Sequence, residues 1–109
     1  MPDQIRDKLI EVARERTVTY YSDIAPMAGL DMSLPNDRYE IGALLDDINR
    51  VEHAQGRSLL SAVVVHKDTL VPGQGFFTLA RDMGLFIGTD RDRFYIEELR
   101  RVHDYWVKH

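Results

Sequence analysis

The chain has 109 residues, of which 44% are hydrophobic and 29% charged, and it contains no cysteine. This length suits one domain with a single core, and the lack of cysteine excludes disulfide frameworks, cysteine-ligated zinc, iron–sulfur clusters and thiol nucleophiles. The formal net charge is −4, so the molecule as a whole does not attract phosphate polyanions.

A helix and a short strand are predicted at the start of the chain. Over residues 3–16 the apolar positions Ile5, Leu9, Val12 and Ala13 follow the spacing of an amphipathic helix. Residues 17–20 are β-branched or aromatic, which favours a short strand.

A second, shorter helix is expected next. Ser22 offers a hydroxyl N-cap, Pro26 falls early in the helix, and Gly29 is its expected end. Residues 30–36 contain Asp31, Ser33 and Pro35, which predicts a connection.

The strongest helical pattern of the sequence follows this connection. Asp37 and Glu40 have the spacing of a capping box, and Gly56 is the expected end. The apolar residues between them repeat with the period of a helix: Ile41, Leu44, Leu45, Ile48 and Val51. The next run, Leu59–Val65, is apolar except for Ser61, which predicts a strand buried on both faces at the centre of a sheet.

Two further helices are predicted in the last third. Residues 72–75 (PGQG) form a turn before a short helix that begins at Phe76 and is closed by Gly84. Residues 85–87 are a brief strand or a packed tail. Thr89 or Asp90 then opens a final helix with an apolar stripe that docks on the core: Tyr95, Leu99, Val102 and Trp106.

Three short motifs resemble one known family. Residues 18–25 (VTYYSDIA) with Ala28-Gly29 are similar to the V-(S/T)-T-Y-G-(E/D)-I-A…A-G segment in the winged-helix domain of alkylguanine-DNA alkyltransferases and alkyltransferase-like proteins. Residues 41–44 (IGAL) resemble the V-G-x-A core of that family's recognition helix, and Val64-Val65 resembles the strand that follows it.

The resemblance implies a winged-helix fold in which the long helix enters the minor groove of DNA and Tyr21 supports nucleotide flipping. The family's reactive P-C-H-R-V segment falls on residues 60–64 (LSAVV), so the alkyl-accepting thiol is missing and direct alkyl transfer is excluded. The arginine that props open the duplex in the family falls at Tyr39, with Arg38 one position earlier.

The long helix, interpreted as a recognition helix, is expected to expose residue types that read base edges. These exposed residues are Arg38, Tyr39, Gly42, Ala43, Asp46, Asn49, Arg50 and His53. Asp46 and Asp47 oppose this interpretation, because carboxylates repel phosphate. Residues 1–55 carry six basic against eleven acidic side chains, so DNA binding would need a local basic patch, and the alternative is an ordinary solvated helix face.

The Gly73–Gly75 turn is a candidate phosphate contact. Backbone N–H groups at the start of the next helix could face an anion, with Lys67 and Arg81 on either side. The alternative is a plain tight turn in which the glycines supply positive φ.

Catalytic and metal chemistry receive little support from the sequence. Ser61 and His66 are five residues apart, so on an extended strand they would lie about 16 Å apart on opposite faces, at about 3.3 Å per residue. The histidines lack metal-binding spacings such as H-x-x-x-H. The aromatic residues are interpreted as core rather than as a base-stacking platform: Phe76, Phe77, Phe86, Tyr95, Tyr105 and Trp106.

The sequence thus predicts one α+β domain over residues 1–109, a winged helix-turn-helix with an extra C-terminal helix at about residues 90–107. Its predicted function is non-enzymatic, without a cofactor: a cytoplasmic nucleic-acid-binding or regulatory module for double-stranded DNA, or alternatively an adaptor for a protein partner on the same frame. No membrane segment is expected. The segment after Gly84 completes the core or forms a homodimer contact.

The predicted nucleic-acid-binding residues come from four parts of the chain. They are Tyr21, Arg38, Tyr39, Asn49, Arg50, Lys67, Gly73, Gln74 and Gly75. The prediction depends on two crossed helices between Tyr20 and Val65 packing under the apolar run that ends this stretch, with this run extended rather than helical.

Overall fold

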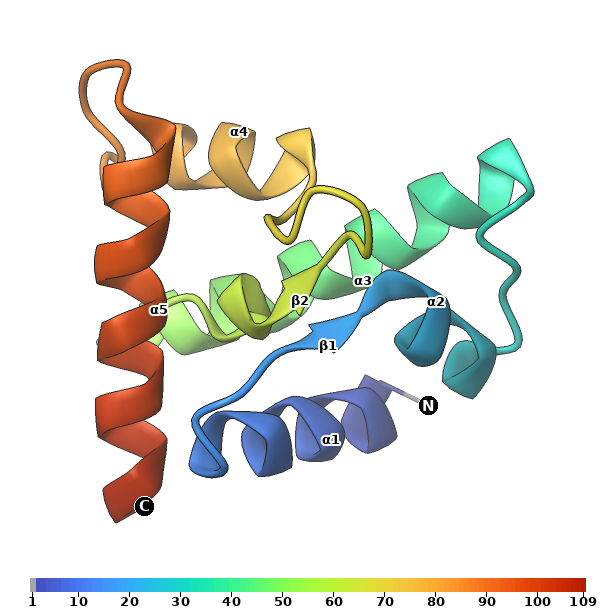
Figure 1. Cartoon of the computed structure of the whole chain (residues 1–109), viewed down its shortest axis with the longest axis horizontal. Helices are drawn as coiled ribbons and strands as arrows, with labels where there is room; N and C mark the ends of the chain where they lie inside the picture. Colours follow the sequence, from blue (N-terminus) through green and yellow to red (C-terminus); the bar gives the residue numbers. More distant parts are fainter. Residues whose placement is uncertain (1) are drawn as a thin grey trace.

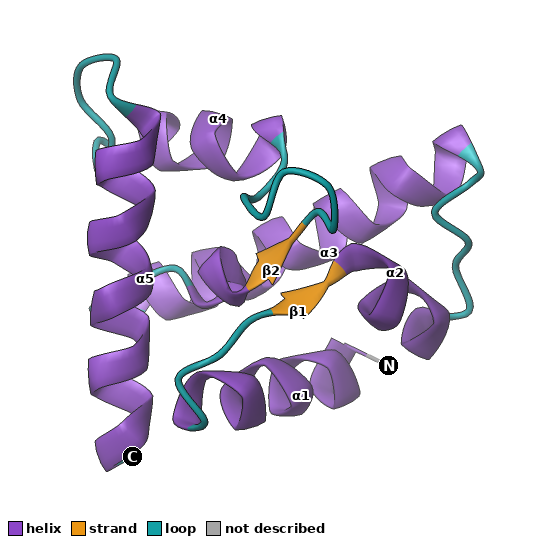
Figure 2. Ribbon diagram, in the orientation of Figure 1, coloured by secondary structure: helices purple, strands orange, loops and turns teal. Residues whose placement is uncertain are grey.

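Helices dominate the computed structural model, which describes residues 2–109 (Figures 1 and 2). Two short strands lie between them, so the architecture is α+β-like. The elements in chain order are α1 (Pro2–Arg14), β1 (Thr19–Tyr20), α2 (Tyr21–Ile24), the 3₁₀ helix η1 (Ala25–Ala28), α3 (Pro35–Ala54), the 3₁₀ helix η2 (Leu60–Val63), β2 (Val64–Val65), α4 (Gln74–Asp82) and α5 (Arg91–Lys108).

The buried run Leu59–Val65 occupies the middle of the molecule. Figure 1 shows α1, α3 and α5 arranged around it, and η2 contacts all three helices. All seven residues of the run are buried, so the predicted burial is confirmed. Among residues 2–109, no helix is long and apolar enough to span a membrane.

The predicted seven-residue central strand is wrong for most of its length. Leu60–Val63 form η2, and only Val64 and Val65 pair, in parallel, with Thr19 and Tyr20. Side chains bind the backbone of this segment where a neighbouring strand would: Glu98 accepts the N–H of Leu59 at 2.8 Å, and Tyr95 donates to the carbonyl of Ala62 at 3.1 Å. Because β1 ends where α2 begins, pairing stops after two residues.

Two predicted helix caps are also wrong. Ser22 lies inside α2, whose N-cap is Tyr20 without a side-chain hydrogen bond. Asp37 lies in the first turn of α3, which starts at Pro35 because proline fits the first helical turn. The Asp37 carboxylate instead accepts the backbone N–H of Asp31 at 2.8 Å, which ties the preceding loop to the helix.

Other predicted boundaries are confirmed. Gly29, Gly56 and Gly84 adopt positive φ just after η1, α3 and α4, respectively. A residue in this left-handed conformation commonly closes a helix. Asp90 caps α5 by accepting the N–H of Arg93 at 3.0 Å. Residues 85–87 form no strand. Only Phe86 of the three is buried, whereas Leu85 and Ile87 are exposed, so the alternative of a packed tail holds for Phe86 alone.

The buried face of the long helix departs from the predicted one after Ile48. Ile41, Leu45 and Ile48 are buried as expected, but Val51 is 53% exposed. Asn49 and Glu52 are fully buried in its place. Beyond Ile48, the end of α3 therefore presents polar rather than apolar side chains to the interior.

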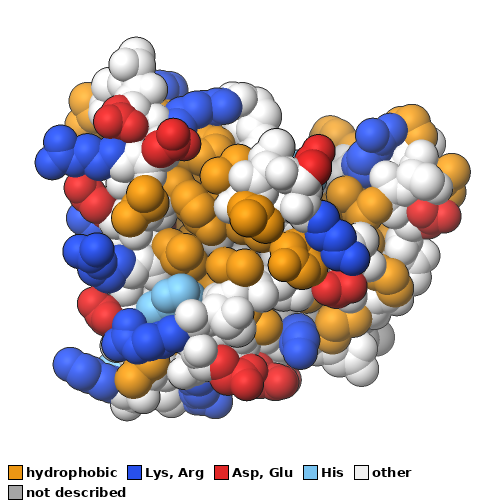
Figure 3. All heavy atoms as spheres, in the orientation of Figure 1, with side chains coloured by type: hydrophobic (Ala, Val, Ile, Leu, Met, Phe, Trp, Pro, Cys, Tyr) orange, Lys and Arg blue, Asp and Glu red, His pale blue; other side chains and the backbone are white. Residues whose placement is uncertain are grey.

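Most of the aromatic residues belong to the core, as predicted. Phe76, Phe77, Phe86, Tyr95 and Trp106 are all buried. Figure 3 shows hydrophobic side chains gathered in the middle of one face of the molecule, with basic and acidic side chains interspersed along the edge formed by α5.

Candidate functional site

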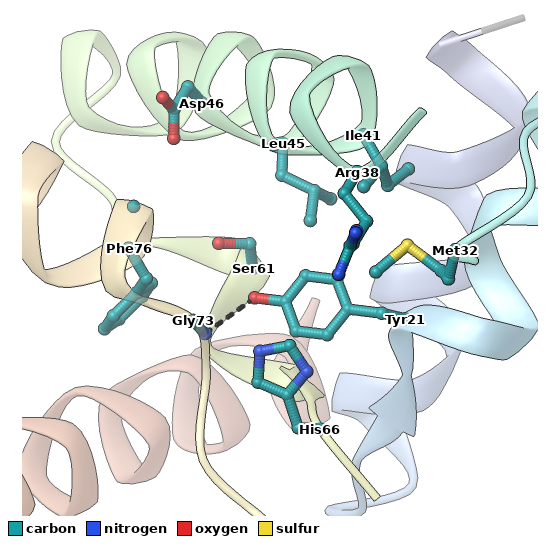
Figure 4. A pocket seen from close by; sticks show the side chains of 12 residues that line it. Tyr21, Met32, Arg38, Ile41, Leu45, Asp46, Ser61, His66, Gly73 and Phe76 are labelled. Atoms are coloured by element: carbon teal, nitrogen blue, oxygen red, sulfur yellow. Dashed lines mark hydrogen bonds between the residues drawn. The ribbon is translucent and has the colours of Figure 1, made fainter. Parts of the chain in front are cut away.

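A small cavity lies between α3, Tyr21 and the chain that leads into α4 (Figure 4). Its volume is about 190 Å³, below the range of pockets for drug-sized ligands. The lining residues are Tyr21, Met32, Arg38, Ile41, Gly42, Leu45, Asp46, Ser61, His66, Gly73, Gly75 and Phe76. We call this cavity the inner pocket.

Tyr21 is fixed on one wall of the inner pocket. Its hydroxyl oxygen accepts the backbone N–H of Gly73 at 2.9 Å, and its ring stacks on His66 with centroids 4.5 Å apart. A Cβ on Gly73 would lie 3.2 Å from Nε2 of His66, so glycine allows this close approach. Burial raises the pKa of Tyr21 and Asp46 adds to the shift, while the bond from Gly73 opposes it. The phenol is therefore protonated at neutral pH, and its hydrogen is not engaged by Gly73.

Helix α3 supplies the opposite wall. Arg38, Gly42 and Asp46 lie one turn apart and all line the inner pocket. Nothing lies within 4 Å of where a Cβ on Gly42 would be. Burial raises the pKa of Asp46 and Asp47 adds to the shift, while Arg50 lowers it. This wall thus offers a guanidinium near the start of the helix and a carboxylate two turns later.

A second hollow of about 370 Å³ adjoins the inner pocket and shares Tyr21, Met32, Arg38 and His66 with it. Ser22, Lys67 and Asp68 complete its lining. Lys67 places its ammonium 5.4 Å from the centroid of the Tyr20 ring, within cation–π range. We call this hollow the outer basin. Arg38 and Lys67 are its basic lining residues.

The inner pocket contains a hydroxyl held by a buried amide. Ser61 is buried, and its Oγ accepts a hydrogen from Nδ2 of Asn49 at 2.7 Å. The Ser61 backbone N–H donates to Oδ1 of the same amide at 3.0 Å. The prediction that Asn49 is exposed on the recognition helix is therefore wrong, because α3 turns it toward η2.

The structure brings five of the nine predicted residues together. Tyr21, Arg38, Gly73 and Gly75 line the inner pocket, and Lys67 lines the outer basin. Asn49 lies behind the pocket as the partner of Ser61.

The other three predicted residues line neither hollow. Tyr39 is 79% exposed, and Arg50 is exposed and paired with Asp47 at 3.0 Å. Gln74 bonds to Thr78 and Arg91.

The predicted geometry of the glycine turn is corrected in three ways. Neither glycine supplies a positive φ, because Gly73 has a φ of −72° and Gly75 lies within α4. Helix α4 begins at Gln74 rather than at Phe76, so Gly75 lies in its first turn and Gly73 is the N-cap. Arg81 does not flank this site, because it donates to the carbonyl of Gly88 and lies 4.3 Å from the Phe86 centroid.

Met32, His66, Ser61 and Phe76 are pocket residues that the prediction missed, and Asp46 was considered only as a repulsive charge. Ser61 and His66 were expected to lie far apart, on opposite faces, because an extended strand was predicted between them. Because Leu60–Val63 is a 3₁₀ helix, both residues line the same cavity. The sequence contained a signal for Ser61, since it is the one polar residue in a buried run.

Comparison with known proteins adds no identification, because no family model, no curated protein and no solved structure matches this chain.

Proposed function

We propose that this chain is a non-enzymatic, winged-helix-type module that binds double-stranded DNA and receives one unstacked base in the inner pocket. One observation carries the proposal: an aromatic wall, a ring-sized apolar cavity and two basic side chains converge on one site. Proteins that bind an extruded base use such a pocket, with stacking on side chains and hydrogen bonds to the base edge.

The aromatic wall supports recognition of a flat ring. Tyr21 and His66 are locked against each other at an interplanar angle of 30°, and Tyr21 is held in place by Gly73. A fixed ring is a better stacking surface than a mobile one, because little conformational entropy is lost when the ligand binds.

The two basic residues support contact with the strand that carries the base. Arg38 and Lys67 both line the outer basin, through which a nucleotide in the inner pocket would remain joined to its neighbours. Asp68 lines the same basin and reduces the local positive charge. We therefore infer about two phosphate contacts and modest affinity.

The winged-helix part of the proposal draws on the order and contacts of the helices. The α2–η1 pair is followed, across a turn that begins at Gly29, by α3, and η1 contacts α3. This order matches a helix-turn-helix, in which N-terminal residues of the second helix contact DNA. Arg38 lies in that part of α3. In this proposal residues 66–73, which follow β2 as turns without a strand, correspond to the wing.

The test is the affinity for a labelled duplex with one unpaired thymidine, measured by fluorescence anisotropy. An unpaired base is already partly unstacked, so we expect tighter binding than to the fully paired duplex. Two phosphate contacts predict that affinity falls about tenfold between about 50 and 200 mM salt.

Arg38→Ala and Arg50→Ala form a matched pair of variants on one helix. Arg38→Ala should weaken binding and reduce the salt slope by about one unit, whereas Arg50→Ala should leave both unchanged. Absence of binding at about 50 mM salt would reject the proposal and favour the protein adaptor. Equal losses in the two variants would also contradict it.

A further inference from the structure

We propose that the Ser61 hydroxyl, oriented by Asn49, is a specificity-determining donor of the inner pocket. It selects a planar ring that presents a hydrogen-bond acceptor, such as a carbonyl oxygen or an unprotonated ring nitrogen, at its inner edge. This inference rests on the proposed function and adds the chemical class of the ring.

The orientation of the Asn49 amide follows from its backbone partner. A peptide N–H can only donate, so the atom of Asn49 that faces the N–H of Ser61 must be the oxygen. The other end of the amide, 2.7 Å from Oγ of Ser61, is then the NH₂ group. An exchange of the amide oxygen and nitrogen would place two donors face to face, so the assignment has one solution.

The direction of the Ser61 hydroxyl follows in turn. Because the amide NH₂ donates, Oγ of Ser61 accepts, and the hydroxyl hydrogen is left over. Within residues 2–109 no hydrogen bond uses this hydrogen, and Ser61 lines the inner pocket. Figure 4 shows Ser61 between Tyr21 and Phe76, across the pocket from α3. A ligand is therefore the natural acceptor for this hydrogen.

The surroundings of Ser61 make the choice of ligand selective. Ile41, Leu45 and Phe76 are buried and line the same cavity. In such apolar surroundings an unpaired donor is costly, and a made hydrogen bond is stronger than in water. A ring with a C–H or N–H group at this point would leave the hydroxyl hydrogen unpaired, whereas an acceptor would satisfy it.

The experiment compares two probes of the same shape. One is the duplex with an unpaired thymidine, and the other carries a 2,4-difluorotoluene nucleotide in its place, which lacks the carbonyl oxygens. We expect the wild-type protein to prefer thymidine about tenfold, the effect of one buried hydrogen bond. Ser61→Ala should reduce the preference to less than about twofold, mainly by weakening thymidine binding.

Ser58→Ala is the matched control, because Ser58 precedes η2 and lines a different hollow. It should keep the wild-type preference. Thermal unfolding of each variant shows whether the protein is folded at the temperature of the binding assay.

Asn49→Asp tests the orienting role without removing Ser61. Carboxylate oxygens can accept both the N–H and the hydroxyl of Ser61, so the hydroxyl hydrogen turns away from the pocket. We expect the preference for thymidine to fall below about twofold, although Ser61 is still present.

The outcomes separate this inference from the proposed function. If the wild-type protein binds neither duplex, the proposed function fails and the inference fails with it. If it binds both duplexes equally, or if folded Ser61→Ala or Asn49→Asp keeps the tenfold preference, base binding stands and the role of Ser61 is rejected.

Discussion

Two buried polar centres lie one turn apart on α3, and they differ in how completely their hydrogen bonds are made. Glu52 is fully buried and accepts from Arg6, at 2.6 Å, and from Arg57, at 2.5 Å. Both guanidinium groups lie within 6 Å of the Trp106 ring centroid, in cation–π range. This centre uses both carboxylate oxygens and ties α1 and the end of α3 to α5.

The second centre, Asn49 with Ser61, is neutral and incomplete. Two hydrogen bonds join the pair, and one hydroxyl hydrogen remains beside a cavity. The difference suggests that a polar centre with all its partners serves the fold, whereas one with a spare donor beside a cavity serves recognition. Three predictions test this division of roles.

The largest expected effect is on the charged centre. Glu52→Gln removes the charge that two arginines share, and breaking a buried ion pair on one side costs about 3–5 kcal/mol. Because the Arg6 and Arg57 side chains are 30% and 20% exposed, water can partly solvate them, and we expect about 3 kcal/mol. Urea unfolding followed by circular dichroism gives the free energy.

Glu97→Gln is the matched control for this prediction. Glu97 also pairs with two arginines, Arg93 and Arg101, but its side chain is 48% exposed. Surface ion pairs contribute at most about 1 kcal/mol, so this variant should lose less than that. Similar losses in both variants would show that burial does not distinguish Glu52.

The sequence alone predicts the helices well, because their period and end signals are local. The long α3 and the final α5 follow from apolar spacing. Gly84 follows the end of α4 as predicted, and Asp90, one of the two predicted caps, opens α5. The strand prediction for residues 60–63 failed for a non-local reason. Their backbone is bound by side chains far away in sequence, such as Tyr95 on Ala62, which a pattern within the run cannot show.

The same contrast between local signals and non-local contacts applies to the candidate site. Tyr21, Arg38 and Gly73 were predicted from a motif, a helix face and a turn, and all three line the inner pocket. Asn49 was placed on the wrong face because its polarity suggested exposure. Its burial depends on Ser61 being opposite, which becomes visible only when α3 and η2 are placed together.

An intermediate effect is expected from pH at Tyr95, which supports the segment that carries Ser61. Burial raises the pKa of Tyr95 to about 12, and Tyr21 adds to the shift. Since the pKa is about 10 in an unfolded chain, the folded state favours the neutral phenol. This contribution is fully present below pH 10 and is lost as the pH rises from 10 to 12.

Tyr95→Phe removes both the titration and the hydrogen bond to Ala62. Below pH 9 the wild-type protein should be more stable than the variant by about 1 kcal/mol. Near pH 12 the order should reverse, because only the wild-type protein must keep a phenol neutral. A difference in unfolding free energy that stays constant between pH 8 and 12 would contradict the assignment.

The smallest effect is expected at Ser61. Ser61→Ala leaves one N–H of the Asn49 amide without its acceptor, whereas the backbone N–H of residue 61 can still donate to Oδ1. The net loss should be about 1 kcal/mol, well below that of Glu52→Gln, in the same urea titration. A loss as large as that of Glu52→Gln would mean that the hydroxyl is part of the folding core. A small loss together with altered base preference would instead place Ser61 where the fold tolerates change, so that the pocket could acquire a different ligand preference while the charged centre holds the helices in place.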